Sequence, residues 1–278
     1  MAKHLYPPHQ SQRGFTLIEM IIVIVVGGIV AGITTQVLTQ PINAYIDSTR
    51  RATLTATADS ALKRMQRDIR RALPNSIRIS ADGRTLELLH LVDGGRYRSQ
   101  LASDGSGNIL DFSLTDTSFD ALGPLQYFAD ISLGSDRVVV YPLNSVGSDP
   151  YAGDNTSIIS NTSTATNIVF SAFQFPFSSP QQRFFIIDTP ISYACDISAT
   201  AAKDKVLMRY DGYAIQAAQP LPPASGNAIQ ANFISDCTFR YNAGSSTRAG
   251  LVSLELVVAD ETGESVRLLH QIHVDNQP

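Results

Sequence analysis

The residues best placed for chemistry stand near the start of the chain, just ahead of a long apolar run. Residues 13–19 read Arg-Gly-Phe-Thr-Leu-Ile-Glu, and residues 20–33 carry no charge. A glycine before Phe15 leaves the peptide bond open to a protease, because it has no side chain to obstruct attack. Cutting after Gly14 would give Phe15 a free amine, a natural partner for the carboxylate of Glu19. We therefore expect a cleavage site at this junction.

The apolar run must form the element that positions these groups. Residues 15–33 contain Glu19 as their only charge, and as a helix they would span about 28 Å, close to the core of a bilayer. Lys3 and Arg13 are the only Lys, Arg, Asp or Glu residues ahead of it, so that end is expected to stay cytoplasmic. An ordinary secretory signal would carry its small cleavage-site residue after the apolar core, whereas Gly14 stands before it.

Glu19 is unusual because carboxylates inside membrane helices are costly and normally have partners. The partner that we expect is the new amine of Phe15, on the same chain or on a neighbour. The alternative is that Glu19 lies at the level of the headgroups and reaches out to water.

Residues 14–19 with the apolar helix behind them resemble the leader junction of type IV pilins and type II secretion pseudopilins. The resemblance implies that a membrane prepilin peptidase cuts after Gly14 and methylates the amine of Phe15. It implies that Glu19 helps to dock the subunit into a growing filament. It also implies a single-pass protein of the bacterial inner membrane, with its C-terminal domain in the periplasm before it enters a pilus or filament.

The chain divides into four expected segments. They are a leader at residues 1–14, a transmembrane and assembly helix at 15–38, an amphipathic periplasmic helix with its connector at 39–80, and a sheet ectodomain at 81–278. Pro41 is expected to kink or interrupt the helix, because proline lacks an amide hydrogen and crowds the preceding turn. Glycines at 27–32 predict either a flexible point or close packing between helices.

A helical period returns at residues 49–73. One face is apolar and recurs at three- and four-residue steps: Leu54, Ala58, Ala61 or Leu62, Met65, Ile69 and Leu73. The other face is basic: Arg50, Arg51, Lys63, Arg64, Arg67, Arg70 and Arg71. Spacing predicts local pairs of Asp68 with Arg64 and Arg71, and a helix end at Pro74. The basic face is either solvated or pairs with neighbouring subunits.

The remainder reads as strands and surface loops. Strands are expected at 85–92, 137–141, 167–175, 183–187, 206–215, 237–241, 251–259 and 265–274. The polar turn at 260–263 predicts a hairpin between the last two. Residues 145–166 and 219–232 are expected to be loops. The predicted fold class is α+β, with a long N-terminal helix packed on antiparallel sheet and an enlarged loop and sheet region.

Two cysteines, Cys195 and Cys237, are expected to form a disulfide. A zinc site would need more Cys or His around them, and a redox motif would place them close together. The predicted orientation puts both in an oxidising compartment, where pairing is the default.

The sequence contains few residue patterns that indicate catalysis, metal binding or cofactor binding. His270 and His273 should face opposite sides of a strand, which prevents them from sharing a metal. Residues 104–108 resemble a calcium loop only faintly, since Ile109 and Thr115 replace its glycine and its bidentate glutamate, so a turn is expected. No catalytic residue, metal or cofactor is predicted. The formal net charge of −4 also speaks against nucleic acid as the main partner.

Residues 70–78, 237–241 and 248–252 are similar to the MshO-type minor pilins of mannose-sensitive haemagglutinin (MSHA) pili. That resemblance implies a minor subunit that primes or caps a filament, with prepilin peptidase, other minor and major pilins and the inner-membrane assembly platform as partners. A J-type minor pseudopilin of type II secretion is the first alternative. The others are a tip adhesin that uses loop 145–166, a membrane-anchored periplasmic enzyme and a subunit for nucleic-acid uptake.

Overall fold

The structure is a computed structural model that describes residues 14–223, 227–244 and 249–277, with only the backbone described at Leu38 and Asn227. The expected leader therefore lies outside the described residues, apart from Gly14. Contacts divide the chain into two compact units, Met1–Arg50 and Arg51–Pro278, which are described separately below.

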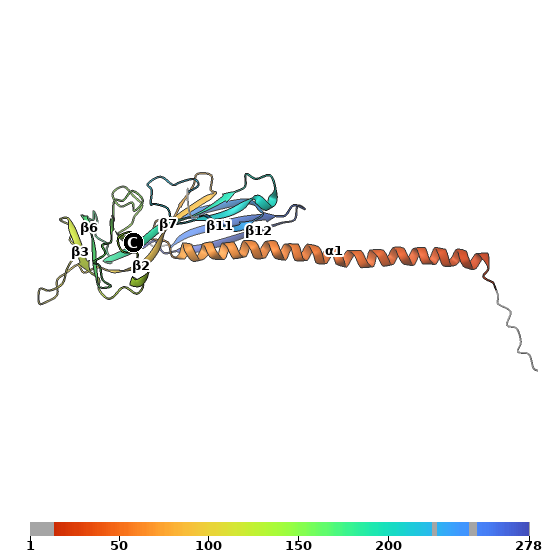
Figure 1. Cartoon of the computed structure of the whole chain (residues 1–278), viewed down its shortest axis with the longest axis horizontal. Helices are drawn as coiled ribbons and strands as arrows, with labels where there is room; N and C mark the ends of the chain where they lie inside the picture. The colour runs from red at the N-terminus through yellow and green to blue at the C-terminus, as the bar shows by residue number, and fades with distance from the viewer. Residues whose placement is uncertain (1–13, 224–226, 245–248, 278) are drawn as a thin grey trace, which may run out of the picture. The chain divides into compact units, whose positions relative to one another are not determined.

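One helix, α1 (Leu17–Arg70), begins in the first unit and ends in the second (Figure 1). Pro41 lies inside this helix, so the predicted interruption is wrong. Proline removes one backbone hydrogen bond, and membrane-type helices tolerate it where other groups satisfy the backbone. Pro41 lacks the amide that would bond the Val37 carbonyl, and the helix nevertheless continues to Arg70.

The last five turns of α1 carry the predicted apolar face into the core of the second unit. Leu54 is 6% exposed, and Ala58, Ala61, Leu62, Met65 and Ile69 are at most 1% exposed, so this prediction is confirmed. The helix ends at Arg70, ahead of Pro74. Its end is set by pairing with a strand, because Leu91 donates its amide to the Arg71 carbonyl and Leu73 donates to the Leu89 carbonyl.

The described residues of the second unit form three antiparallel sheets. The largest has the order β1-β2-β7-β4-β5, with β8 on β7 and β9 on β8. Its strands are β1 (Arg78–Ile79), β2 (Thr85–Arg96), β4 (Arg137–Val140), β5 (Thr156–Ile158), β7 (Arg183–Asp196), β8 (Val206–Tyr210) and β9 (Asn227–Asn232). A second sheet contains β10 (Ile234–Asn242), β11 (Gly250–Ala259) and β12 (Ser265–Val274), and a third pairs β3 (Asp116–Asp120) with β6 (Asn167–Phe173). Short 3-10 turns lie at Phe128–Asp130 and Ala202–Asp204.

All eight predicted strands are present, and β11 and β12 form the expected hairpin around Asp260 and Gly263. The sequence did not reveal β1, β3, β5 or β9. Two of these, β5 and β9, occupy parts of the segments that were predicted to be loops at 145–166 and 219–232. Both are short and partly polar, so only their pairing with β4 and β8 makes them strands.

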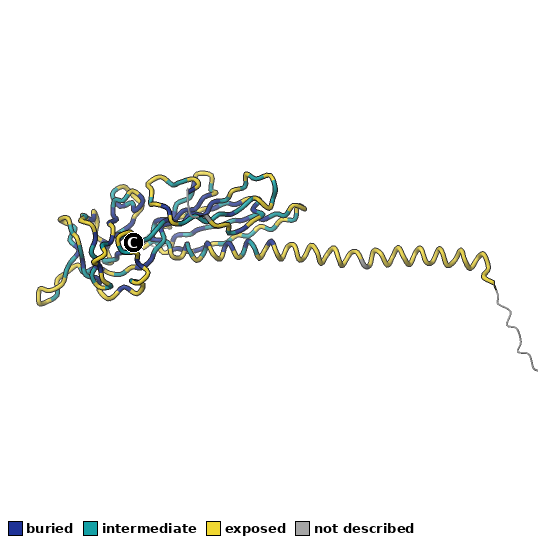
Figure 2. Tube along the Cα trace, in the orientation of Figure 1, coloured by how far each residue is buried: buried dark blue, intermediate teal, exposed yellow. Residues whose placement is uncertain are grey.

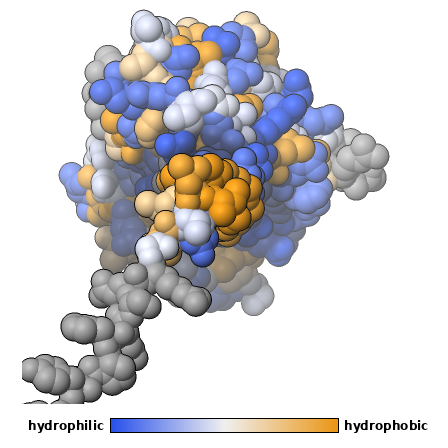
Figure 3. Space-filling view, turned by 90° about the vertical axis from the view of Figure 1, so that its right-hand side faces the viewer, coloured by the Kyte–Doolittle hydropathy of each residue, from blue (hydrophilic) through white to orange (hydrophobic). Residues whose placement is uncertain are grey.

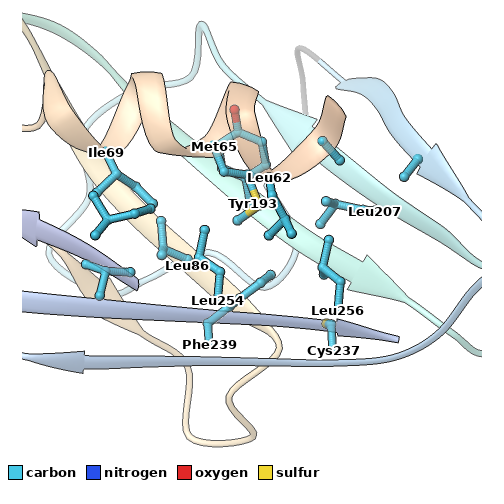
Figure 4. Close-up of a cluster of buried hydrophobic side chains, with 14 of the residues drawn as sticks. Leu62, Met65, Ile69, Leu86, Tyr193, Leu207, Cys237, Phe239, Leu254 and Leu256 are labelled. Atoms are coloured by element: carbon cyan, nitrogen blue, oxygen red, sulfur yellow. The ribbon is translucent and has the colours of Figure 1, made fainter. Parts of the chain in front are cut away.

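The main core joins α1 to both larger sheets (Figure 4). Leu62, Met65 and Ile69 of the helix pack on side chains that the strands supply: Leu86, Tyr193, Leu207, Phe239, Leu254 and Leu256. On β11, Leu254, Leu256 and Val258 are fully buried, as their alternation with Glu255 and Val257 predicts. The structure thus confirms an α+β fold with a long helix on antiparallel sheet.

A second lobe is inserted between two strands that lie side by side. β2 and β7 pair from Thr85 and Ala194 to Arg96 and Arg183, and the 86 residues between their ends form a long insertion that also supplies β4 and β5 to the same sheet. We call residues 97–182 the insertion lobe. Its side chains form a second core, rich in aromatic rings, together with Val92 of β2 and Phe184 and Ile186 of β7. In this core Phe119 lies 4.9 Å from Phe184 and 5.9 Å from Phe170 between ring centroids. The buried segments of both lobes are seen in Figure 2.

Candidate processing and assembly site

The first turn of α1 is closed by a reciprocal pair of side chains. The Glu19 carboxylate accepts hydrogen bonds from the backbone amide and the hydroxyl of Thr16, at 2.8 and 2.9 Å. The Thr16 hydroxyl oxygen accepts from the Glu19 amide at 3.3 Å, and the Thr16 carbonyl accepts from Met20 at 3.2 Å. This is a capping box, which satisfies amides that a helix start leaves without partners.

The capping box identifies a second role for Glu19 that the sequence analysis missed, although its Thr-x-x-Glu pattern was visible. Both hydrogen bonds from Thr16 end on Oε2, and Oε1 has no hydrogen-bond partner among the described residues. In the uncut chain the nitrogen of Phe15 is an amide, so the expected pairing of its free amine with Glu19 stays a prediction. The structure leaves one carboxylate oxygen open for it.

The expected cleavage junction between Gly14 and Phe15 is exposed, and the fold does not depend on which residue stands at position 14. A Cβ atom added at Gly14 would meet no heavy atom within 4 Å, and the backbone there does not have the positive φ that favours glycine. The Phe15 side chain is 84% exposed. Because nothing within the described residues requires a glycine at this position, a requirement for it must come from another molecule.

The helix behind the junction exposes its apolar side chains on every side. From Leu17 to Ile33 the large apolar residues are 48–79% exposed, and none of the most apolar 18-residue window is buried. Figure 3 looks along α1 from its N-terminal end and shows the apolar surface around it. Among the described residues, α1 is the one helix that is both long enough and apolar enough to cross a membrane. Exposed apolar area of this size marks contact with lipid or protein.

Residues 9–35 match the family model described as the prokaryotic N-terminal methylation motif. The match spans Gly14, Phe15 and Glu19 and ends within the apolar helix. Comparisons with curated proteins and with solved structures returned no match. The motif supports a subunit of the type IV pilin or pseudopilin type, and it favours a structural subunit over an enzyme. It implies processing by a prepilin peptidase and assembly with other pilins, and with the apolar helix it is consistent with membrane anchoring.

The cysteines are joined as expected. Cys195 on β7 and Cys237 on β10 form a disulfide with their sulfur atoms 2.00 Å apart. Cys237 is 2% exposed and belongs to the main core. The disulfide joins the seven-stranded sheet to the three-stranded sheet. The positions of the two cysteines in the sequence could not show which sheets the bond would connect.

The other residues considered for chemistry do not converge. His270 is half-buried on β12 and His273 is exposed, three residues further along the strand. Asp104 accepts from the amide and hydroxyl of Ser106, a local turn as expected for residues 104–108. Among the residues that the structure describes, no three His, Cys, Asp or Glu side chains gather in a way that could hold a metal ion.

The charged face of α1 is organised by tertiary contacts. Asp68 accepts from Nε of Arg209 at 2.9 Å and from the hydroxyl of Tyr193 at 2.8 Å. The predicted pairs of Asp68 with Arg64 and Arg71 are therefore wrong, because strands β7 and β8 bring better partners to that carboxylate. Burial and the negative charge of Asp68 raise the pKa of Tyr193. Lys63 does form a local pair, with Asp59 at 2.7 Å.

Proposed function

We propose that this chain is a minor type IV pilin-like subunit that takes part in starting, building or capping an MSHA-type pilus. The observation that carries the proposal is the methylation motif at residues 9–35, placed where a capped helix with exposed apolar faces begins. Such a helix is stable only in lipid or against other helices. A filament subunit that is first anchored and then assembled needs both environments.

The mechanism follows from the groups at the helix start. Cutting after Gly14 converts the nitrogen of Phe15 from an amide into an amine, which the same peptidase methylates. The amine carries a positive charge, and the open Oε1 of Glu19 on this or a neighbouring subunit can accept it. Pairing removes the cost of an isolated carboxylate in the apolar zone, and it occurs only after correct processing. The partners are prepilin peptidase, other minor and major pilins and the assembly platform of the inner membrane, with the sheet unit in the periplasm.

The insertion lobe supports a specialised subunit over a repeated one. Its 86 residues extend the largest sheet by β4 and β5 and add a second, aromatic core to the main core between α1 and the sheets. A J-type minor pseudopilin remains the first alternative. Deleting the gene separates the two, because loss of surface pili supports the pilin and loss of protein secretion supports the pseudopilin.

A tip adhesin is the second alternative, and one loop of the insertion lobe favours it. Val146 is fully exposed, and the adjoining Gly147 lies beside the ring of Phe177, which is 48% exposed. Apolar side chains presented by a loop are typical of binding surfaces. Binding of a host glycan or surface that is lost when residues 145–148 are replaced would support this function.

The experiment that tests the main proposal compares Glu19→Gln with the unaltered protein in its native cell. Glutamine keeps an oxygen for the Thr16 hydrogen bonds but has no charge for the amine of Phe15. We expect Glu19→Gln to be inserted, cut and methylated, yet to be depleted from sheared filaments. Normal incorporation of this variant would overturn the docking role. A mature N-terminus other than methylated Phe15, read by mass spectrometry, would overturn the proposal as a whole.

A further inference from the structure

Positive charge is concentrated at the end of α1. Residues 63–71 hold five of the 21 Lys and Arg residues of the chain, namely Lys63, Arg64, Arg67, Arg70 and Arg71. Lys63 pairs with Asp59, and Arg64 donates to Ser60 and to the Gln230 carbonyl. Within the described residues, the guanidinium groups of the other three have no hydrogen bond or ion pair.

The helix dipole does not by itself explain why so many basic residues stand at the end of α1. Cations near a helix C-terminus interact favourably with its dipole, but like charges three and four residues apart repel each other. The acid within this stretch, Asp68, is already bonded to Arg209 and Tyr193. The unpaired guanidinium groups therefore remain available to an anion from outside the chain.

A hollow lies beside two of these arginines. Its volume is about 500 Å³, and we call it the arginine cleft. Arg70 and Arg71 line one part of it, Leu91 and Val92 supply apolar surface, and Tyr127 and Asp130 belong to the insertion lobe. Tyr127 is half exposed, and its backbone amide is fixed by the carboxylate of Asp93 at 2.7 Å. A smaller hollow of about 210 Å³ is lined by Arg64, Arg67 and Arg209, together with Asp68, Tyr193 and Gln230.

We propose that the arginine cleft binds an acidic segment of a neighbouring filament subunit, a step that rests on the proposed function. Guanidinium groups bind carboxylates through paired hydrogen bonds, and the half-exposed Tyr127 with Leu91 and Val92 can cover an apolar part of the same segment. Asp93 and Asp130 offset the charges of Arg70 and Arg71, so the cleft lacks the net positive charge that a continuous phosphate backbone needs. Asp93 already accepts hydrogen bonds from the amides of Gly94 and Tyr127, which leaves the guanidinium groups open to one or two carboxylates of a protein segment. The mixed lining therefore fits a protein segment better than a nucleic acid.

The first experiment measures the affinity of the cleft without a filament. A labelled peptide of six glutamates is titrated into the detergent-solubilised full chain, and its fluorescence anisotropy is followed. We expect Arg70→Glu with Arg71→Glu to raise the dissociation constant at least about tenfold, because two attractive charges become repulsive. The matched control is Lys203→Glu with Arg240→Glu, since both residues are exposed and lie outside the cleft. The control should bind as the unaltered chain does.

Three results of this titration would overturn the inference. They are absence of peptide binding, an equal loss of affinity in the control pair, and displacement of the peptide by inorganic phosphate or a short single-stranded DNA at lower concentration than by unlabelled peptide. The last result would mean a phosphate site.

The second experiment identifies the occupant in cells. Tyr127 is replaced by the photoreactive benzoylphenylalanine, filaments are irradiated, and the cross-linked peptide is sequenced. We expect it to come from a chain with its own N-terminal methylation motif and to contain Asp or Glu close to the cross-link. Filaments that contain the protein but give no cross-link, or one to a segment without acids, would overturn the inference and leave the proposed function standing. If the protein from native cells keeps its leader, as read by intact mass spectrometry, yet still binds the peptide through Arg70 and Arg71, the proposed function instead would be removed.

Discussion

Thr16 and Glu19 hold each other across the first turn of α1, with both donors of Thr16 bonded to the same carboxylate oxygen of Glu19. The relationship gives Glu19 a structural role before any processing takes place. It also orients the carboxylate beside the junction where the amine of Phe15 would form. Helix capping and subunit docking can thus use one side chain, because a carboxylate has two oxygens.

Thr16→Ala should loosen the start of the helix. Losing an N-cap hydroxyl costs about 1 kcal/mol, which corresponds to roughly fivefold faster local opening. We expect amides of the first turn to exchange with deuterium faster by about that factor in detergent micelles. Thr16→Ser keeps the hydroxyl and should exchange at nearly the original rate. Equal rates for the alanine and serine variants would show that the capping box contributes nothing.

Gly14→Val should leave the chain uncut without altering its fold. The added side chain has open space in the structure, so the block acts on the peptidase, whose attack it obstructs. Gly28→Val is a matched control, since a Cβ there also meets nothing within 4 Å but lies well inside the helix. Intact mass spectrometry from native cells should show the precursor for the first variant and the shortened, methylated chain for the second. Normal cutting of Gly14→Val would contradict the assignment of the junction.

Replacing Cys195 and Cys237 together with alanine should lower the free energy of unfolding. The bond closes a loop with a sequence separation of 42 residues. Closing a loop of that size stabilises by about 4 kcal/mol on the chain-entropy account. Denaturant unfolding of the purified protein, followed by circular dichroism, measures the difference. A change below about 1 kcal/mol would mean that the two sheets are held together by their core alone.

Tyr193→Phe should change how stability depends on alkaline pH. The pKa of Tyr193 is raised in the folded state by burial and by the charge of Asp68, so the folded protein holds this proton more tightly than the unfolded chain. The stability that protonated Tyr193 contributes to the folded protein is present below the ordinary tyrosine pKa of about 10 and is lost as the pH rises above that value.

The phenylalanine variant should be less stable at neutral pH by about 1 kcal/mol, through loss of the hydrogen bond to Asp68. Its deficit relative to the unaltered protein should shrink between pH 9 and 11, measured by denaturant unfolding at each pH. Tyr127→Phe, at a half-exposed position, serves as the control and should lose little stability at neutral pH. A deficit that stays constant with pH would contradict the raised pKa.

The local sequence pattern was enough to predict which face of an element is buried wherever a single helical or strand periodicity dominated. The apolar steps from Leu54 to Ile69 predicted the buried face of α1, and the alternation at Leu254, Leu256 and Val258 predicted the buried face of β11. Prediction failed where a single residue was read without its surroundings. Pro41 did not end the helix, and Asp68 was assigned to helix neighbours when it binds Arg209 and Tyr193.

The amino-acid sequence by itself determined the methylation motif around Gly14, Phe15 and Glu19, the apolar helix, the fold class and the presence of two cysteines. These depend on residue types a few positions apart or on regular periods, so no long-range contact is needed to see them. Only the tertiary structure decided that the chain between β2 and β7 forms the insertion lobe, that the disulfide joins two sheets and that Arg70 and Arg71 border a hollow. Each of these joins segments far apart in the chain, and strand pairing and core packing bring them together.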